Sequence, residues 1–151
     1  MEFPIIFKKE TNSNQLLKIM NKNTDLGFLV LRIAIGALML FHGIAKLSGV
    51  SFIEGMLHEK GLPTFLAYGV YITEIIAPVL ILVGYRTRLA SAAYVLGLLF
   101  TVVLVHSGDL FSLNENGGWQ LELIGLYLLG ALALFFTGGG KFAVSSINKW
   151  D

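Results

Sequence analysis

Long apolar runs alternate with short polar breaks along the chain. Four runs approach the length of about 20 residues that a helix needs to cross a hydrocarbon core of about 30 Å. They cover residues 26–47, 63–84, 88–106 and 119–137, and the breaks between them are rich in glycine, asparagine and charged residues. Backbone polar groups in lipid must be hydrogen-bonded internally, and no alternating strand pattern is present. We therefore predict an all-α fold, a four-transmembrane-helix bundle within a membrane domain of residues 26–145.

Three segments lie outside these runs. Residues 1–25 form a basic N-terminal arm without the apolar stretch of a signal peptide; it is either an amphipathic helix on the membrane surface or disordered. Residues 146–151 form a C-terminal tail. The connection from Ser48 to Lys60 carries apolar residues at helical spacing. It predicts a short helix that either rests on the headgroups and caps the bundle or acts as a lid over a site.

Composition supports a membrane protein and excludes several other classes. Apolar residues make up 55% of the chain, charged residues only 14%, and the mean hydropathy is +0.72. A soluble domain has about 25% charged residues. A disordered chain combines low hydrophobicity with high charge, which is the opposite of this composition. The net charge of +1 excludes an electrostatic nucleic-acid binder. The absence of cysteine excludes disulfides, thiolate nucleophiles and cysteine-held iron–sulfur clusters.

The placement of lysine and arginine predicts the orientation. Cytoplasmic loops of membrane proteins carry an excess of these residues. Eight of the 11 lie on one side of the predicted spans, two (Lys46 and Lys60) on the other, and Arg32 lies inside a span. Both termini are therefore predicted to be cytoplasmic. The eight are Lys8, Lys9, Lys18, Lys22, Arg86, Arg88, Lys141 and Lys149.

Ionisable residues inside the spans are the candidates for function, because each is unfavourable in lipid by roughly 2.5–3.5 kcal/mol on insertion scales. In the first span, one face carries Arg32 and Lys46 with small residues between them. In the second span, Glu74 shares a face with small residues and a proline. We expect the two faces to meet. Arg32 and Glu74 then either form an ion pair that fixes the helix register, or serve function, as a carboxyl that carries a proton or as a charge that binds a substrate headgroup.

A second group of polar residues is predicted at similar depth near the outer membrane face. It comprises His42, Lys46, His106 and Glu122. Together they would bind an anion or a quinone carbonyl, or relay protons. The alternative is that Lys46 reaches to the interface and His106 is a satisfied helix end. Two histidines and a carboxylate are also metal ligands, but no metal site is predicted because the histidines lack the spacing of a metal motif.

Several short motifs occur in a fixed order over residues 26–145. They are Leu31-Arg32, Phe41-His42-Gly43-x-x-Lys46-Leu47, Gly61-Leu62-Pro63 before a helix with a central Glu74, Gly84-x-x-Thr87-Arg88-Leu89-Ala90, His106 at the end of the third run, Asn116-Gly117-Gly118-Trp119, and Gly138 to Lys141-Phe142. In this order and spacing the chain resembles the DoxX family of bacterial integral membrane proteins. One position departs from the pattern: the family often has an acidic residue where this chain has Gln120, and Glu122 follows on another helix face.

The resemblance implies a multi-pass protein of four helices in the bacterial cytoplasmic (inner) membrane. Relatives are described as subunits of quinone-linked sulfur oxidation or as partners of membrane-associated oxidoreductases. We therefore expect a small membrane subunit of a redox system with a buried polar site, rather than an enzyme on its own. The expected cofactor is a quinone and none is covalent; the expected partners are membrane lipid and a membrane-associated oxidoreductase.

Two other functions stay open. One is a transporter of a small solute or protons that uses Glu74 as its coupling carboxyl; it would need a homo-oligomer or a narrow polar core. The other is a structural membrane scaffold in which every buried charge serves stability alone.

Overall fold

The fold is all-helical. The computed structural model describes the backbone of residues 7–151 and the side chains of residues 24–151. Within these residues, the one β-type contact is an isolated bridge between Leu113 and Trp119. The elements are α1 (Phe7–Ala45), η1 (Lys46–Ser48), α2 (Ser51–Glu59), η2 (Thr64–Tyr68), α3 (Gly69–Tyr71), η3 (Ile72–Ile76), α4 (Ala77–Val83), α5 (Thr87–Val105), η4 (Ser107–Asp109) and α6 (Glu122–Thr137).

Three helical stretches of the described chain are long and apolar enough to cross a membrane. They are Thr24–Ser48, Thr64–Val83 and Thr87–Val105, in agreement with the first three predicted spans. The fourth apolar helix, α6, has 16 residues and a length of about 24 Å, shorter than the hydrocarbon core. The prediction placed its start at Trp119. That residue instead pairs with Leu113, and its indole N–H donates to the Leu110 carbonyl over 2.9 Å, which keeps it in the preceding loop.

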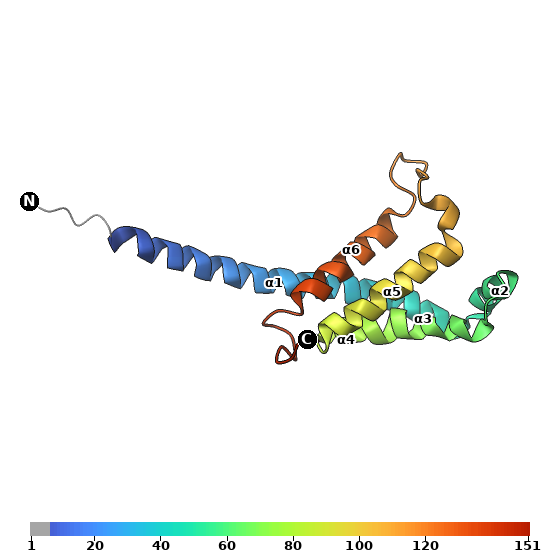
Figure 1. Cartoon of the computed structure of the whole chain (residues 1–151), viewed down its shortest axis with the longest axis horizontal. Helices are drawn as coiled ribbons and strands as arrows, with labels where there is room; N and C mark the ends of the chain where they lie inside the picture. Colours follow the sequence, from blue (N-terminus) through green and yellow to red (C-terminus); the bar gives the residue numbers. More distant parts are fainter. Residues whose placement is uncertain (1–6) are drawn as a thin grey trace, which may run out of the picture.

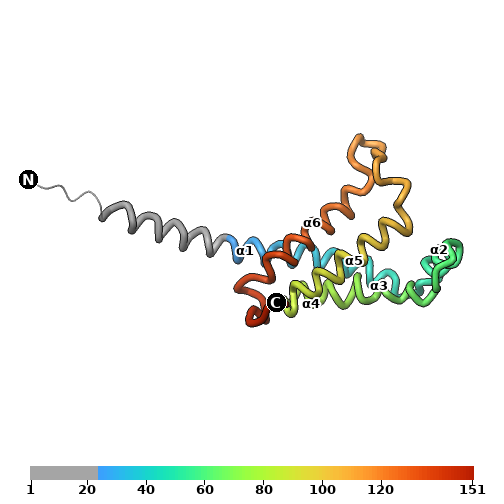
Figure 2. Tube along the Cα trace, in the orientation of Figure 1, coloured from blue at the N-terminus to red at the C-terminus, as the bar shows by residue number. Residues whose placement is uncertain are grey.

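The helices form two pairs. One pair is α1 with the continuous stretch α3–η3–α4, and the other is α5 with α6 (Figure 1). The pairs meet through α4 and α5 and enclose an apolar core. The loop after α5 and α2 lie at the end of the molecule far from residue 151 (Figure 2). We call this end the α2 end. The opposite end, where residues 138–151 return along the bundle, is the strap end. The core residues are Ile35, Met39, Ala77, Ile81, Ala90, Tyr94, Leu98, Tyr127, Ala131 and Leu134.

Glycines allow the predicted faces of the first two spans to meet. A Cβ atom at Gly36 would lie 2.9 Å from the Pro78 carbonyl oxygen, and one at Gly43 would overlap the backbone of Glu74. On the other side, a Cβ atom at Gly97 of α5 would overlap the Thr73 side chain. The π-helical turn η3 is therefore held between two glycines, Gly43 and Gly97. The expectation that the Arg32–Lys46 face packs against the Glu74 face is confirmed.

After α6 the chain returns across the other end of the bundle as an irregular segment, residues 138–151, which we call the strap (Figure 1). Asp25 Oδ1 accepts the Lys141 amide over 3.1 Å, and Arg32 Nη2 donates to the Phe142 carbonyl over 3.0 Å. The Trp150 carbonyl accepts the backbone amides of Arg88 and Leu89 in the first turn of α5. These contacts seal the end of the bundle where α4 finishes and α5 begins.

Asp151 organises the end of the strap. Its Oδ2 accepts the amides of Asn148 and Ile147 over 2.8 and 3.0 Å, and the Ser145 hydroxyl over 2.8 Å. The bond from the Asn148 amide is the main cause that lowers the pKa of Asp151 below its ordinary value. A carboxyl with a lowered folded-state pKa stabilises the fold above its unfolded-state pKa, and that contribution is lost as the pH falls through the lowered value.

From Phe7 onward the backbone of the basic N-terminal arm is helical and continuous with the first span as part of α1. Residues 1–6 and the side chains of residues 7–23 lie outside the described part of the chain. A position of the arm on the membrane surface stays a prediction.

Two glycines of α1 offer a matched test of the helix packing. Gly43→Ala should lower the stability by about 1–3 kcal/mol, because the new methyl group meets the Glu74 backbone and overpacks the contact. Gly27 has no neighbouring atom within 4 Å of its Cβ position. Gly27→Ala should therefore stabilise α1 by up to about 1 kcal/mol through helix propensity. Thermal unfolding midpoints in one detergent compare the two; equal midpoints would contradict the close approach at Gly43.

Candidate functional site

A cavity of about 400 Å³ lies at the α2 end, between α2, the 64–74 stretch and α5. Its walls are mostly apolar, and the polar side chains among them are Lys46, Thr73, Glu74 and Thr101. Pockets that bind small molecules in proteins have this volume and this mixture of apolar walls with few polar groups. The remaining lining residues are Phe52, Ile53, Met56, Leu66, Ala67, Gly69, Val70, Gly97, Phe100, Leu104 and Val105.

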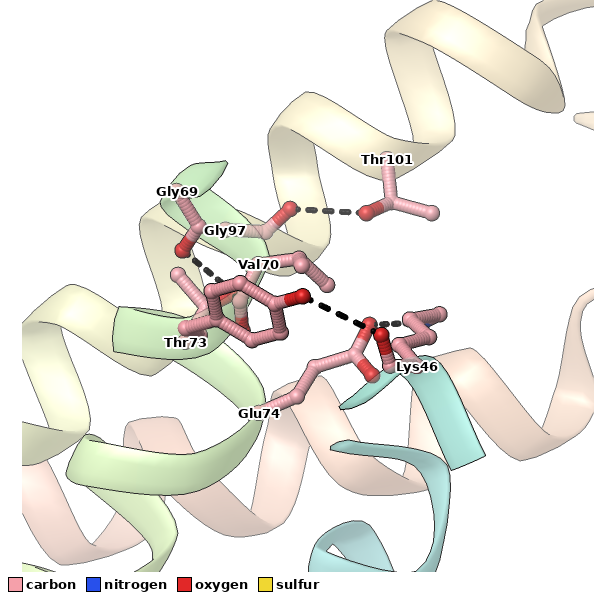
Figure 3. Close-up of polar contacts among 8 residues, drawn as sticks. Lys46, Gly69, Val70, Thr73, Glu74, Gly97 and Thr101 are labelled. Atoms are coloured by element: carbon pink, nitrogen blue, oxygen red, sulfur yellow. Dashed lines mark hydrogen bonds and ion pairs between the residues drawn. The ribbon is translucent and has the colours of Figure 1, made fainter. Parts of the chain in front are cut away.

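The charged feature of the cavity is an ion pair between Lys46 and Glu74 (Figure 3). Lys46 Nζ donates to Glu74 Oε1, and the Tyr71 hydroxyl donates to the Lys46 carbonyl over 3.2 Å. The Glu74 side chain is 13% exposed and that of Lys46 35%. The second carboxylate oxygen, Glu74 Oε2, is buried and has no hydrogen-bond partner among the described residues. The cavity wall thus holds a neutralised charge pair, and one oxygen of its carboxylate is buried without a partner.

The local backbone explains how Glu74 reaches this position. Glu74 lies in η3, where the helix widens into one π-helical turn between α3 and α4. Such turns insert one extra residue into a helix and are frequent at functional sites. The Thr73 hydroxyl donates to the Val70 carbonyl over 3.3 Å, and the Thr101 hydroxyl donates to the Gly97 carbonyl over 3.0 Å (Figure 3). Both threonines are therefore satisfied within their own helices and present a mildly polar wall.

Helix α2 forms one wall of the cavity. Phe52, Ile53 and Met56 line it, while Leu57 is fully buried in a small second core with Val50, Ala67 and Leu104. The predicted short helix between Ser48 and Lys60 is confirmed. It lies over the cavity, a position that fits both the capping and the lid alternatives, and the buried Leu57 anchors it there.

The alternative in which Arg32 and Glu74 form an ion pair is wrong. Arg32 lies 14 residues before Lys46, about 21 Å along the helix axis, so only Lys46 is level with Glu74. Arg32 is 1% exposed at the strap end, where it bonds to Phe142; its Nε and Nη1 atoms have no hydrogen-bond partner among the described residues. The guanidinium packs against Gly84, the left-handed residue that ends α4. The negative end of that helix dipole stabilises a cation there.

The four residues of the predicted outer group do not gather around the cavity. Lys46 alone lines it. His42 packs edge-on against Tyr127 with ring centroids 6.2 Å apart, and His106 Nδ1 pairs with Asp109 over 3.0 Å. Glu122 is exposed at the start of α6. Among the described residues, no three His, Asp or Glu side chains come together in a metal-binding arrangement.

Sequence reasoning missed three residues of the site: Thr73, Gly97 and Thr101. Their signal in the sequence is weak, because threonine and glycine are common in membrane helices. Gly97 and Thr101 lie one helical turn apart, and Thr73 lies next to Glu74. This spacing would have placed two hydroxyl groups and one close helix contact beside the carboxyl.

Comparisons with known proteins show which family the chain belongs to. The family model that matches the chain is DoxX, over residues 27–107. This range contains every residue that lines the cavity. A protein named “Putative oxidoreductase CatD” from Bacillus subtilis (strain 168) is 30% identical over 109 residues, which cover 72% of this chain and 81% of the relative.

A second relative matches over a longer stretch. It is “Inner membrane protein YqjF” from Escherichia coli (strain K12), 30% identical over 135 residues, which cover 87% of this chain and all of the relative. No solved structure matches the chain.

The ion pair can be tested by a double-mutant cycle. Lys46→Met leaves the Glu74 carboxylate without its cation. It should lower stability by about 2 kcal/mol, between the values for exposed and buried pairs. Adding Glu74→Leu removes the orphaned charge and should restore most of this loss. Unfolding midpoints in detergent measure the cycle, with Glu122→Gln on the exposed surface as the control. Additive effects of the two changes would contradict a direct pair.

Proposed function

The chain belongs to the DoxX family of membrane proteins, and from this membership we propose that it is a small membrane subunit of a redox system that holds a quinone in the cavity beside Lys46 and Glu74. It is a multi-pass membrane protein, with three candidate spans between residues 24 and 105. Its location is the inner membrane, as the name of the E. coli relative states for that protein.

The proposed topology adds α6 as a fourth crossing, with both termini cytoplasmic. The basic residues at the strap end, Arg86, Arg88, Lys141 and Lys149, support this orientation. A helix of 16 residues is shorter than the hydrocarbon core, and local thinning of the bilayer accommodates such a helix at modest free-energy cost.

The chemistry of the cavity supports a quinone. A quinone has a flat apolar ring with carbonyl oxygens and an apolar tail, which suit walls of leucine, valine and phenylalanine. The Lys46 ammonium is a donor for a carbonyl oxygen. The observation that carries the proposal is the Lys46–Glu74 pair in the wall of an otherwise apolar cavity, where the carboxyl can exchange a proton beside the bound ring.

The composition indicates which protein supplies the electrons in this proposal. The chain has no cysteine to hold an iron–sulfur cluster or to form a redox-active disulfide. Electrons would therefore come from a membrane-associated oxidoreductase, and this subunit would bind the quinone and exchange its protons through Glu74. The name of the B. subtilis relative supports a link to oxidoreductases. On this proposal the chain is a subunit and not an enzyme by itself.

Quinone binding tests the proposal. Calorimetric titration of ubiquinone-1 into nanodiscs containing the protein, corrected with empty nanodiscs, should give saturable binding. Glu74→Gln should weaken it about tenfold, or about 1.4 kcal/mol, because Lys46 loses the carboxylate that holds its ammonium in place to donate to the quinone carbonyl. Val70→Phe should abolish binding by filling the cavity, whereas Val79→Phe on the exposed face should not.

Two results would overturn it. One is the absence of saturable binding to the folded protein; the other is equal affinity of the wild type, Glu74→Gln and Val70→Phe. If proton flux into liposomes instead depends on Glu74, the transporter alternative gains. If Glu74→Gln lowers the stability of the protein and changes neither quinone binding nor proton flux, the scaffold alternative gains.

A further inference from the structure

The strap exposes more apolar surface than water favours. Ile147 is 95% exposed, and three other large apolar side chains of the strap are also exposed, all within nine residues. Exposed apolar groups that cluster in this way mark a surface covered by another molecule or by lipid. The other three are Phe142, Val144 and Trp150.

The backbone contacts of the strap fix its depth. Val144 and Ser145 donate to the carbonyls of Val83 and Gly84 over 3.2 and 3.1 Å. The Arg88 amide donates to the Trp150 carbonyl over 3.1 Å. The second candidate span finishes at Val83 and the third begins at Thr87. The strap is therefore tied to the level at which two spans leave the hydrocarbon, which is the headgroup layer.

The charges around the strap are mainly positive. In the described ranges 24–32, 83–91 and 137–151, the cations near the surface are Arg86, Arg88, Lys141 and Lys149, and the acids are Asp25 and Asp151. Both carboxylates are engaged: Asp25 accepts the Lys141 amide, and Asp151 accepts donors of the strap itself. The cations have no such commitment to an acid of the strap, apart from the attraction between Arg86 and Asp151.

Two of the cations lie over aromatic rings. Lys149 Nζ is 5.3 Å from the centroid of Trp150, and the Arg86 guanidinium is 5.6 Å from that of Tyr85. Aromatic rings with neighbouring basic groups are typical of the membrane–water interface, where the ring lies among the headgroups and the cation meets phosphate.

We propose that the strap is a binding surface for anionic phospholipid, with Ile147 and Trp150 inserted into the interfacial layer and Lys141 and Lys149 on the headgroup phosphates. Lipid fits the strap better than a protein partner does, because the exposed apolar side chains share one short segment with Lys141 and Lys149 at headgroup depth. The proposal needs no quinone in the cavity, which lies at the opposite end of the bundle, so the two can fail separately.

Trp150 supplies the probe. The chain has two tryptophans, so Trp119→Phe leaves Trp150 as the only one. The purified Trp119→Phe protein in detergent is titrated with phosphatidylglycerol or phosphatidylcholine brominated near the headgroup end of the acyl chains. The expected result is strong quenching of Trp150 fluorescence, half-complete at a much lower concentration of phosphatidylglycerol than of phosphatidylcholine.

Charge variants make the test specific. Lys141→Gln and Lys149→Gln should each raise the phosphatidylglycerol midpoint about fivefold, which corresponds to about 1 kcal/mol for each basic residue near an anionic surface. Lys60→Gln, an exposed lysine at the α2 end, should leave the midpoint unchanged. Ile147→Ser should weaken quenching by both lipids.

Two outcomes would overturn the proposal. In the first, the two lipids quench Trp150 at equal concentrations, so that the surface has no preference for anionic headgroups. In the second, neither brominated lipid quenches Trp150 while aqueous iodide does, so that the strap faces water or a protein partner. Circular dichroism of each variant shows that the helices are retained.

Discussion

The structure depends on the constraint that a charge in a membrane span must be neutralised nearby. Glu74 meets it through Lys46, and the contact is made at a place where backbones approach closely. Gly43 on α1 and Gly97 on α5 hold the π-helical turn from two sides, so the carboxyl is presented to a cavity and not to lipid. Without these glycines the helices would stand further apart, and the lysine would not reach its partner.

A second buried charge meets the same constraint in another way. Arg32 has no carboxylate partner; it lies at the carbonyl end of α4 and donates to the strap carbonyl of Phe142. Helix carbonyl groups and one backbone acceptor thus replace an acidic residue. The two charged centres lie at opposite ends of the bundle with the apolar core between them. This separation lets the proposed ligand site at the α2 end and the proposed lipid surface at the strap end act independently.

The cavity combines properties that favour a neutral, apolar ligand. Its one charge pair is self-neutralised, so it attracts no free ion strongly, yet one carboxylate oxygen is left without a partner. Helix α2 covers it and is anchored by the buried Leu57. The cavity is partly open to its surroundings, so an apolar molecule dissolved in the bilayer can reach it without movement of α2.

The sequence by itself determined the membrane class, the first three spans and the facing of the Arg32 and Glu74 stripes, because hydrophobic length and small-residue spacing are local properties of a helix. It also predicted a helix between Ser48 and Lys60. Only the tertiary structure decided that Glu74 pairs with Lys46, that Arg32 donates to the Phe142 carbonyl of the strap, and that α6 begins after Trp119. Pairing depends on the relative height of two helices and on where a loop folds back. Those quantities are set by contacts between distant segments, which no pattern along the chain records.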